Sequence, residues 1–321
     1  MADRTPLVSV IVPAWNAEDT LGETLASVAA QTYRNIEIII VDDGSTDATA
    51  SVVEQFILRE PRARLIRQPN GGVGAARNAA IAVARGDFIA PIDSDDLWHP
   101  EKLERQVACM LAAEEDVGLV YNWSRIIDEH GRVIAASTSP TLEGDVLDRH
   151  LKWNFIGNGS TPLFRAAIFR NLHYNPALRQ AGCQGCEDYL LQLQIASRSR
   201  FACVPAFLTG YRLRGGEMSG DITAMIRSHI LMFEILREWL PAKYRPVVDR
   251  QLGRQLAALG LTKLRRAEIG GSFANYAKGV RHSAAEAAIE TVSRLVRRIR
   301  NRSSDSHLLG RSFSDLSPDE I

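Results

Sequence analysis

Two runs of apolar, mostly β-branched residues lie close together near the start of the chain, and they constrain its fold more than any other feature. They read LVSVIVP at residues 7–13 and IEIIIVDD at residues 36–43. Nearly unbroken runs of this kind are typical of strands that are buried on both faces of a parallel sheet. Between the runs, Leu21, Leu25 and Val28 recur at the spacing of a helix. The sequence therefore predicts a parallel βαβ unit.

The same alternation of strand and helix patterns continues beyond this unit. The expected elements are a helix around residues 52–56, a strand at 64–68, a helix at 74–84, a strand at 87–93 and a helix at 100–111. Strands that alternate with helices in this way form an α/β sandwich with right-handed crossovers. Farther along, we expect a hairpin around His130 and Gly131, a helix in CEDYLLQLQIA and a strand in FLTGYRL.

The chain divides into three regions by pattern and charge. Residues 1–221 hold the alternating pattern and have 21 basic and 28 acidic side chains, a net charge of −7. Residues 222–302 have a helical pattern, in RSHILMFEILREWL and VSRLVRRIRNR among other stretches, with 16 basic and 6 acidic side chains, a net charge of +10. Residues 303–321 are mostly polar and have 1 basic and 4 acidic side chains, a net charge of −3. Their composition predicts a disordered tail.

The charge of the whole chain is balanced, with 38 Lys and Arg against 38 Asp and Glu. A neutral total, and basic helices without interleaved aromatic residues, argue against a nucleic-acid binder. No apolar run approaches the length of about 20 residues that crosses a membrane, and we expect a cytoplasmic protein. The basic helices are consistent with a solvated surface, with a homodimer contact, or with a peripheral contact at the anionic inner face of a membrane.

Polar residues follow three of the expected strands, at the point where each strand ends. The first strand runs into PAWN at residues 13–16, the second into DDGSTD at 42–47 and the fourth into DSDD at 93–96. The carboxyl ends of parallel strands meet at one edge of a sheet, and ligands bind there in such folds. The sequence therefore predicts a polar site at that edge.

The DSDD cluster places Asp93 and Asp95 one residue apart at a strand end. This arrangement suits a hard divalent cation such as Mg²⁺ or Mn²⁺, which prefers oxygen ligands and often bridges to phosphates. The alternative is an acidic turn that caps the helix beginning near Pro100. The motif alone does not separate the two.

Two other segments hold residues that could contribute to a site. GGVGAARNAA offers Gly72, which lets backbone approach a ligand, and Arg77, which either pairs with phosphate or lies on a helix surface. Its match to a dinucleotide fingerprint is weak, because Arg77 stands where the third Gly belongs. CEDYL holds Glu187 and Asp188, which are either a general base among apolar neighbours or an exposed acidic helix start.

Six segments, taken in order, resemble the family 2 glycosyltransferases of the GT-A fold. They are VSVIVPAWNAEDTLGETLASVAAQTY, IIIVDDGSTDAT, NGGVGAARNAA, GDFIAPIDSDDLWHPEKLE, GCEDYLLQLQIA and YRLRGGEMS, within about residues 7–220. The resemblance implies a GT-A-type α/β fold, in which a mixed, mainly parallel sheet is sandwiched by helices. The C-terminal helical region would follow this domain.

The resemblance also implies roles for individual residues. Contacts with the nucleotide-sugar are implied for Pro13, Ala14, Trp15, Asn16, Asp43, Gly72, Arg77, Asp93, Ser94, Asp96 and Arg212. The D-x-D element of the family binds the cation on the diphosphate, which implies Asp95 and Asp93 as metal ligands and Asp96 as a sugar or ribose contact. The later acidic pair supplies the catalytic base, which implies Asp188 with Glu187 beside it.

The implied function is inverting transfer of a single sugar from a nucleoside-diphosphate sugar, with UDP as the expected nucleotide. The implied acceptor is a hydroxyl of a saccharide or a lipid-linked molecule in surface polysaccharide or glycolipid biosynthesis, and the implied cofactor is Mn²⁺ or Mg²⁺. Processive synthases of the family carry a Q-x-x-R-W motif and several membrane spans, which this sequence lacks. A sugar-nucleotide nucleotidyltransferase and a catalytically silent nucleotide-sugar binding protein are the alternatives.

Overall fold

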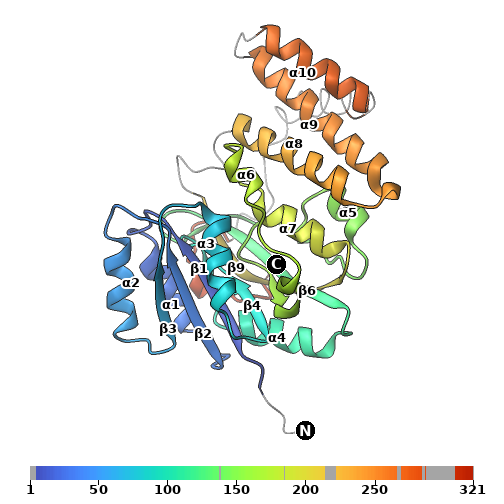
Figure 1. Ribbon diagram of the computed structural model, residues 1–321. Coiled ribbons are helices and arrows are strands. Elements are labelled where there is room, and N and C mark those ends of the chain that lie inside the picture. The colour runs from blue at the N-terminus through green and yellow to red at the C-terminus, as the bar shows by residue number, and fades with distance from the viewer. Residues whose placement is uncertain are drawn as a thin grey trace.

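A mixed β-sheet with helices on both faces forms the N-terminal part of the molecule (Figure 1). The computed structural model describes residues 5–136, 139–183, 185–213, 222–265, 269–283, 286 and 308–320. Within these residues the sheet has nine strands in the order β3-β2-β1-β4-β8-β6-β9-β5, with β7 paired to β6. The strands are β1 (Val8–Ala14), β2 (Ile36–Asp42), β3 (Ala63–Arg67), β4 (Phe88–Pro91), β5 (Leu97–Trp98), β6 (Val117–Ile127), β7 (Val133–Ala136), β8 (Leu163–Arg165) and β9 (Arg200–Arg212).

The first four strands are parallel, as the sequence predicts. β1 lies between β2 and β4, and β3 flanks β2. Short β8 is antiparallel to both β4 and β6, and so joins this parallel group to the long parallel pair β6 and β9. The predicted hairpin is confirmed, because β6 turns into antiparallel β7 through residues 128–132.

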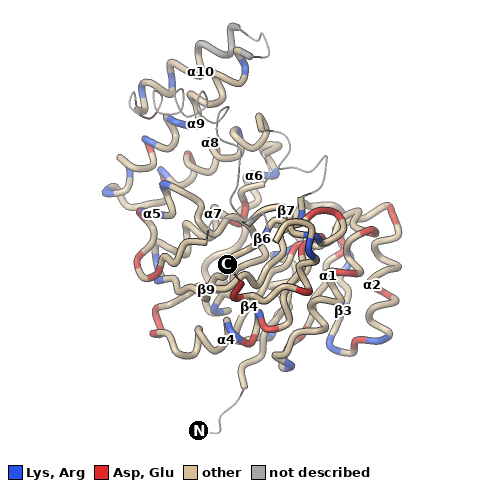
Figure 2. The backbone as a smooth tube through the Cα atoms, turned by 180° about the vertical axis from the view of Figure 1, so that it is seen from behind, with Lys and Arg blue, Asp and Glu red and all other residues tan. Residues whose placement is uncertain are grey.

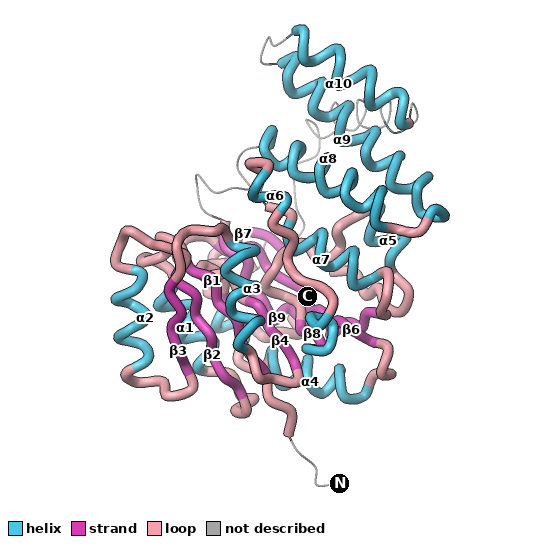
Figure 3. Tube along the Cα trace, viewed as in Figure 1, coloured by secondary structure: helices cyan, strands magenta, loops and turns pink. Residues whose placement is uncertain are grey.

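Helices cover the two faces of the sheet in two groups (Figure 3). The α-helices of the described residues, including three that lie beyond the sheet, are α1 (Leu21–Ala29), α2 (Thr49–Ile57), α3 (Val73–Val83), α4 (Lys102–Ala112), α5 (Leu147–Lys152), α6 (Ala177–Gln180), α7 (Glu187–Ala196), α8 (Ile222–Trp239), α9 (Arg245–Arg265) and α10 (Ile269–His282). Val10 and Val12 of β1 pack with α1 and α4, whereas Ile11 packs with α3 and α7 on the other face. Successive side chains of a strand point to opposite faces, so a strand that is covered on both sides must be apolar throughout.

The predicted helical region is confirmed for α8, α9 and α10, which stack beyond the sheet, above α7 in Figure 1. Phe233 of α8 and Val248 of α9 are buried in the same core as α7. Lys and Arg recur along α9 and α10 (Figure 2). Among the residues that the structure describes, no helix is both long enough and apolar enough to cross a membrane. The segment VSRLVRRIRNR lies outside the described residues, and the predicted membrane or dimer contact of the basic helices stays a prediction.

The prediction of a disordered tail is wrong for residues 308–320. Leu308, Phe313 and Leu316 are buried against Ile127 of β6 and Val133 of β7. These three apolar side chains are dispersed among polar residues, so the average composition of the tail concealed them. Their spacing lets a short segment with little regular structure bury all three, which stabilises it against the hairpin.

Candidate active site

The polar ends of β1, β2 and β4 meet at one edge of the sheet, as predicted. Ala14 at the end of β1 is paired in register with Asp42 at the end of β2, and Ile11 with Pro91 of β4. The backbone N–H of Asp43 donates to the carbonyl of Ala14 at 2.8 Å. The three loops that follow these strands therefore start side by side.

The first two loops are tied together by Asn16. Its backbone N–H donates to Ser45 Oγ at 3.0 Å, and its side-chain oxygen accepts from the Thr46 N–H at 2.9 Å. Asn16 has a φ of +47°, a conformation that Asn tolerates better than most residues. Pro13 and Ala14 are buried within β1, whereas Trp15 is 57% exposed at the rim of the site. Of the PAWN residues, Trp15 and Asn16 are thus the two that are exposed.

Asp43 fixes the loop ahead of α3. Its buried carboxylate accepts hydrogen bonds from Gln68 Nε2 at 2.6 Å and from the backbone N–H groups of Gly71 and Gly72 at 2.9 and 2.7 Å. Gly72 has a φ of +86°, which a side chain would strain. The predicted contacts of Asp43 and Gly72 with a nucleotide stay predictions. In this structure the two residues shape the loop.

Arg77 of α3 lies at the centre of a buried cluster of charges. Its guanidinium is almost completely enclosed, forms an ion pair with Asp93, and lies over the ring of Tyr174 at 5.1 Å. Burial opposes the charged form, but the interactions with Asp93, Tyr174 and Asp188 raise the pKa of Arg77 above its ordinary value. The interpretation of Arg77 as a surface side chain is therefore wrong. It joins the DSDD loop to the acidic start of α7.

Asp188 and Glu187 occupy the first turn of α7, as predicted. Burial, followed by the charges of Asp93 and Glu187, raises the pKa of Asp188 to about 6, although Arg77 acts in the opposite direction. Glu187 is buried and accepts a hydrogen bond from the Gly185 N–H at 2.8 Å. Asp188 is thus a carboxylate that is ionised at neutral pH and more basic than an ordinary Asp.

The DSDD loop divides its carboxylates between an open and an enclosed position. Asp93 has a side chain that is 30% exposed, and Asp95 is partly exposed, with Ser94 between them. Asp96 is completely buried, and its two oxygens accept from Ser160 Oγ at 2.5 Å and from the Arg212 N–H at 2.9 Å. Burial, followed by the charges of Asp95 and Asp93, raises the pKa of Asp96 well above its usual range. A contact of Asp96 with a sugar stays a prediction, and its observed role is to anchor the loop.

Arg212, at the end of β9, holds this loop through hydrogen bonds. Its Nε donates to the carbonyl of Asp95 at 2.6 Å, and its Nη2 pairs with Glu23 at 2.7 Å. Its Nη1 donates to the carbonyls of Asp128 and Glu129 at 3.1 and 2.5 Å. The guanidinium is buried by these partners. The structure therefore gives Arg212 a positioning role, and its predicted contact with the donor stays a prediction.

The donor set of the loop suits a divalent cation whose shell is completed by a substrate. Within the described part of the chain, no group of three or more His, Cys, Asp or Glu side chains is placed to hold a metal ion. Asp93 and Asp95 nevertheless offer hard carboxylate oxygens at a partly exposed edge. Mg²⁺ is often bound in this way, through one or two carboxylates together with phosphate oxygens and water. The residues thus fit a metal that arrives with a diphosphate.

Sequence reasoning missed three residues that organise the site. Tyr174 packs on Arg77, and Ser160 contacts both Asp96 and the N–H of Asp93. A Cβ at Gly159 would lie 2.7 Å from Arg77 Nη2, so only glycine leaves room for the guanidinium. Two of these residues belong to the stretch FIGNGSTPLFR, in which only its irregular composition could be noticed.

Comparison with known proteins places this arrangement in a family. The model described as "Glycosyl transferase family 2" matches residues 9–172, just over half of the chain. "Putative glycosyltransferase EpsH" from Bacillus subtilis (strain 168) is 36% identical over 154 residues, which are 48% of this chain and 44% of that protein. The chain therefore spans less than half the length of this relative.

Two solved structures have a similar fold. S. aureus TarS 1–349 in complex with UDP-GlcNAc gives a TM-score of 0.57 at 21% identity, covering 98% of this chain and 99% of that chain. Mannosyltransferase PcManGT from Pyrobaculum calidifontis, in complex with GDP-Man and Mn²⁺, gives a TM-score of 0.61 at 19% identity, covering 93% and 82%. At such low identity these likenesses establish the fold, which is the predicted GT-A type. From the family match we conclude that the chain belongs to glycosyl transferase family 2.

Proposed function

We propose that this enzyme transfers a single sugar, with inversion, from a UDP-linked donor to a hydroxyl of a saccharide or lipid-linked acceptor. The observation that carries the proposal is the cluster around Arg77. It brings the DSDD loop, through Asp93, close to Asp188, a carboxylate whose pKa is raised to about 6. A base beside a loop of open carboxylates is the arrangement that displacement of a diphosphate requires.

Asp188 acts as the general base in this proposal. Its carboxylate accepts the proton of the acceptor hydroxyl while the oxygen of that hydroxyl forms a bond to the anomeric carbon. The bond from this carbon to the phosphate oxygen breaks, and its electron pair leaves with the nucleoside diphosphate. A single displacement inverts the anomeric centre and needs no covalent intermediate. With a pKa of about 6, Asp188 is mostly ionised at neutral pH and still a useful proton acceptor.

Asp93 and Asp95 would hold Mn²⁺ or Mg²⁺ against the diphosphate. When bound, the cation would offset the negative charge that develops on the leaving group. Arg77 orients Asp93 through their ion pair, and Arg212 orients the Asp95 backbone through the 2.6 Å hydrogen bond to its carbonyl. The Mn²⁺ bound with GDP-Man by PcManGT supports a metal requirement here.

The nucleotide would bind over the ends of β1 and β2. Trp15 exposes its indole at this rim, and Asn16 and Asp43 hold the surrounding loops. TarS, which has a similar fold, is known in complex with UDP-GlcNAc, and this supports UDP as the nucleotide. We place the reaction in surface polysaccharide or glycolipid biosynthesis.

Thermal denaturation with UDP, GDP and dTDP, each with and without Mn²⁺, tests donor binding. We expect one diphosphate, UDP, to raise the melting temperature, and to do so only with the metal. Release of that diphosphate from its sugar conjugates then separates an enzyme from a silent binding protein. Stabilisation by none of the diphosphates would count against the proposal.

A further inference from the structure

We propose that the C-terminal segment 308–320 is a positioning element for the metal-binding loop, and that Phe313 is its central residue. The proposal rests on the proposed function, because it takes Asp93 and Asp95 to be metal ligands. The segment acts on the DSDD loop by two routes that meet at Asp95 and Asp96.

The backbone of the segment is fastened to the β6–β7 hairpin. The N–H of Gly310 donates to the Val133 carbonyl at 2.8 Å, and the N–H of Val133 donates to the Arg311 carbonyl at 2.9 Å. The N–H of Phe313 donates to the carbonyl of Gly131 at 2.9 Å. A fourth contact, from the Phe207 N–H to the Pro318 carbonyl at 2.7 Å, fixes the far end to β9. The segment thus runs along the hairpin much as an added strand does.

The first route is apolar. Phe313 and Leu316 form a buried cluster with Ile127 of β6, and Leu97 packs against this cluster. Leu97 follows Asp96 directly in the chain and is paired with Gly210 of β9. A Cβ at Gly210 would lie 3.0 Å from the Phe313 ring, so the ring rests on the β9 backbone beside Leu97. Removal of the ring would leave a cavity beside Leu97, the residue that directly follows the DSDD loop.

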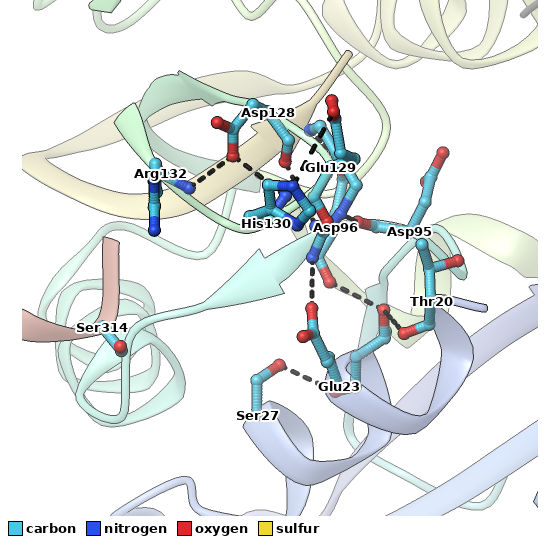
Figure 4. A network of polar contacts seen from close by, with 12 residues as sticks. Thr20, Glu23, Ser27, Asp95, Asp96, Asp128, Glu129, His130, Arg132 and Ser314 are labelled. Carbon is cyan, nitrogen blue, oxygen red and sulfur yellow. Dashed lines mark hydrogen bonds and ion pairs between the residues drawn. The ribbon is translucent and has the colours of Figure 1, made fainter. Parts of the chain in front are cut away.

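The second route runs through the turn of residues 128–132. The Asp128 side chain accepts from the N–H groups of His130 and Arg132, both at 2.9 Å, and so holds the turn in shape (Figure 4). The carbonyls of Asp128 and Glu129 then accept from Arg212 Nη1. The C-terminal segment pairs with Gly131 in this same turn. The position of the turn therefore sets the position of Arg212, whose Nε holds the carbonyl of Asp95.

The ion pairs of the segment are exposed and contribute less than its apolar side chains. Arg105 pairs with Asp319 at 2.6 Å and Arg311 with Glu320 at 3.0 Å, each on the surface. Exposed pairs of this kind contribute little to stability. Phe313 is therefore the residue to change. Leu309, in the same segment and 45% exposed, supplies a matched control.

The test compares Phe313→Ala with Leu309→Ala in the full chain. Substitution of a residue that orients a metal ligand typically weakens metal affinity by about 10–100-fold. Phe313 acts through such residues and not on the ligands directly. For Phe313→Ala we therefore expect about a tenfold rise in the Mn²⁺ concentration that gives half-maximal hydrolysis of a UDP-sugar. At saturating Mn²⁺ the kcat should remain close to that of the wild type. Leu309→Ala should match the wild type, and Phe313→Leu should recover most of the loss.

Hydrogen–deuterium exchange without any ligand gives a second readout. In Phe313→Ala the amides of residues 93–98 and 208–213 should exchange faster than in Leu309→Ala, while those of β1 and β2 should not. If Phe313→Ala fails to fold, Leu316→Ala carries the same comparison, because Leu316 is buried in the same cluster. A wild type with no metal-dependent activity would refute the proposed function. The exchange data would still show whether Phe313 holds the DSDD loop in position. Unchanged exchange at residues 93–98 would overturn the inference.

Discussion

Replacement of Asp188 by Asn should abolish most of the activity while leaving the fold at least as stable as the wild type. Asn keeps the size of the side chain and an oxygen that can accept the hydrogen bond from the Tyr189 N–H, now 2.8 Å long. It cannot accept a proton from an acceptor hydroxyl. General-base catalysis contributes about 10²–10⁴-fold, so kcat should fall by that factor. Binding of UDP with Mn²⁺ should change little.

The stability of this variant follows from the pKa of Asp188. The value rises from 3.8 to about 6 on folding, so the folded state favours the protonated form. The stability that Asp188 contributes is fully present below pH 3.8 and is lost as the pH rises through about 6. A shift of two units corresponds to about 3 kcal/mol, and the partial exposure of Asp188 reduces this figure. At pH 8, Asp188→Asn should therefore be about 1–2 kcal/mol more stable than the wild type.

The assay measures sugar transfer together with urea denaturation at pH 5 and pH 8. In the wild type, kcat/KM should fall about tenfold for each pH unit below 6, because protonated Asp188 is inactive. The gain in stability of Asp188→Asn should be larger at pH 8 than at pH 5. Activity within a few-fold of the wild type would refute the base assignment. Lower stability at pH 8 would show that Asp188 is a structural residue.

Three further substitutions address the rest of the site. Arg77→Ala leaves Asp93 and Asp188, which are both partly exposed, without their shared cation. It should lower the free energy of unfolding by about 2–3 kcal/mol in urea denaturation, less than for a fully buried pair, an expectation that a loss below about 1 kcal/mol would contradict. Asp95→Asn keeps the backbone carbonyl that binds Arg212, so the variant should fold normally but need about 10–100-fold more Mn²⁺ for half-maximal activity. Removal of metal by a chelator should inactivate the wild type, and added Mn²⁺ or Mg²⁺ should restore its activity. Gly72→Ala puts a side chain at a φ of +86° and should cost about 1–3 kcal/mol of stability, and a neutral effect would show that the loop adapts.

The fold could be predicted because its signal is local. Three of the first four strands, β1, β2 and β4, are short apolar runs, and the helices between the strands have their own period. These strands can therefore be predicted without knowledge of their partners. The convergence of PAWN, DDGSTD and DSDD follows from the topology alone. Asp188 was predictable as a base candidate from the resemblance, but its raised pKa depends on Asp93, which is far away in the sequence.

The roles that could not be predicted depend on contacts across long stretches of sequence. Asp96 and Arg212 are 116 residues apart, and their hydrogen bond gives both residues a structural role that the sequence did not indicate. A sequence does not distinguish a polar residue that hydrogen-bonds to a distant residue of the chain from one that binds a ligand. Phe313 presents the opposite case. It is one apolar residue in a polar tail, and only the hairpin that it covers gives it a role.

The proposed sugar transfer can be tested by the release of nucleoside diphosphate from a panel of UDP-, GDP- and dTDP-sugars. We expect metal-dependent release from UDP-sugars by the wild type. We also expect Asp188→Asn, although folded and able to bind UDP, to release diphosphate at least about a hundredfold more slowly. No release from any donor, or equal release by Asp188→Asn, would contradict the proposal.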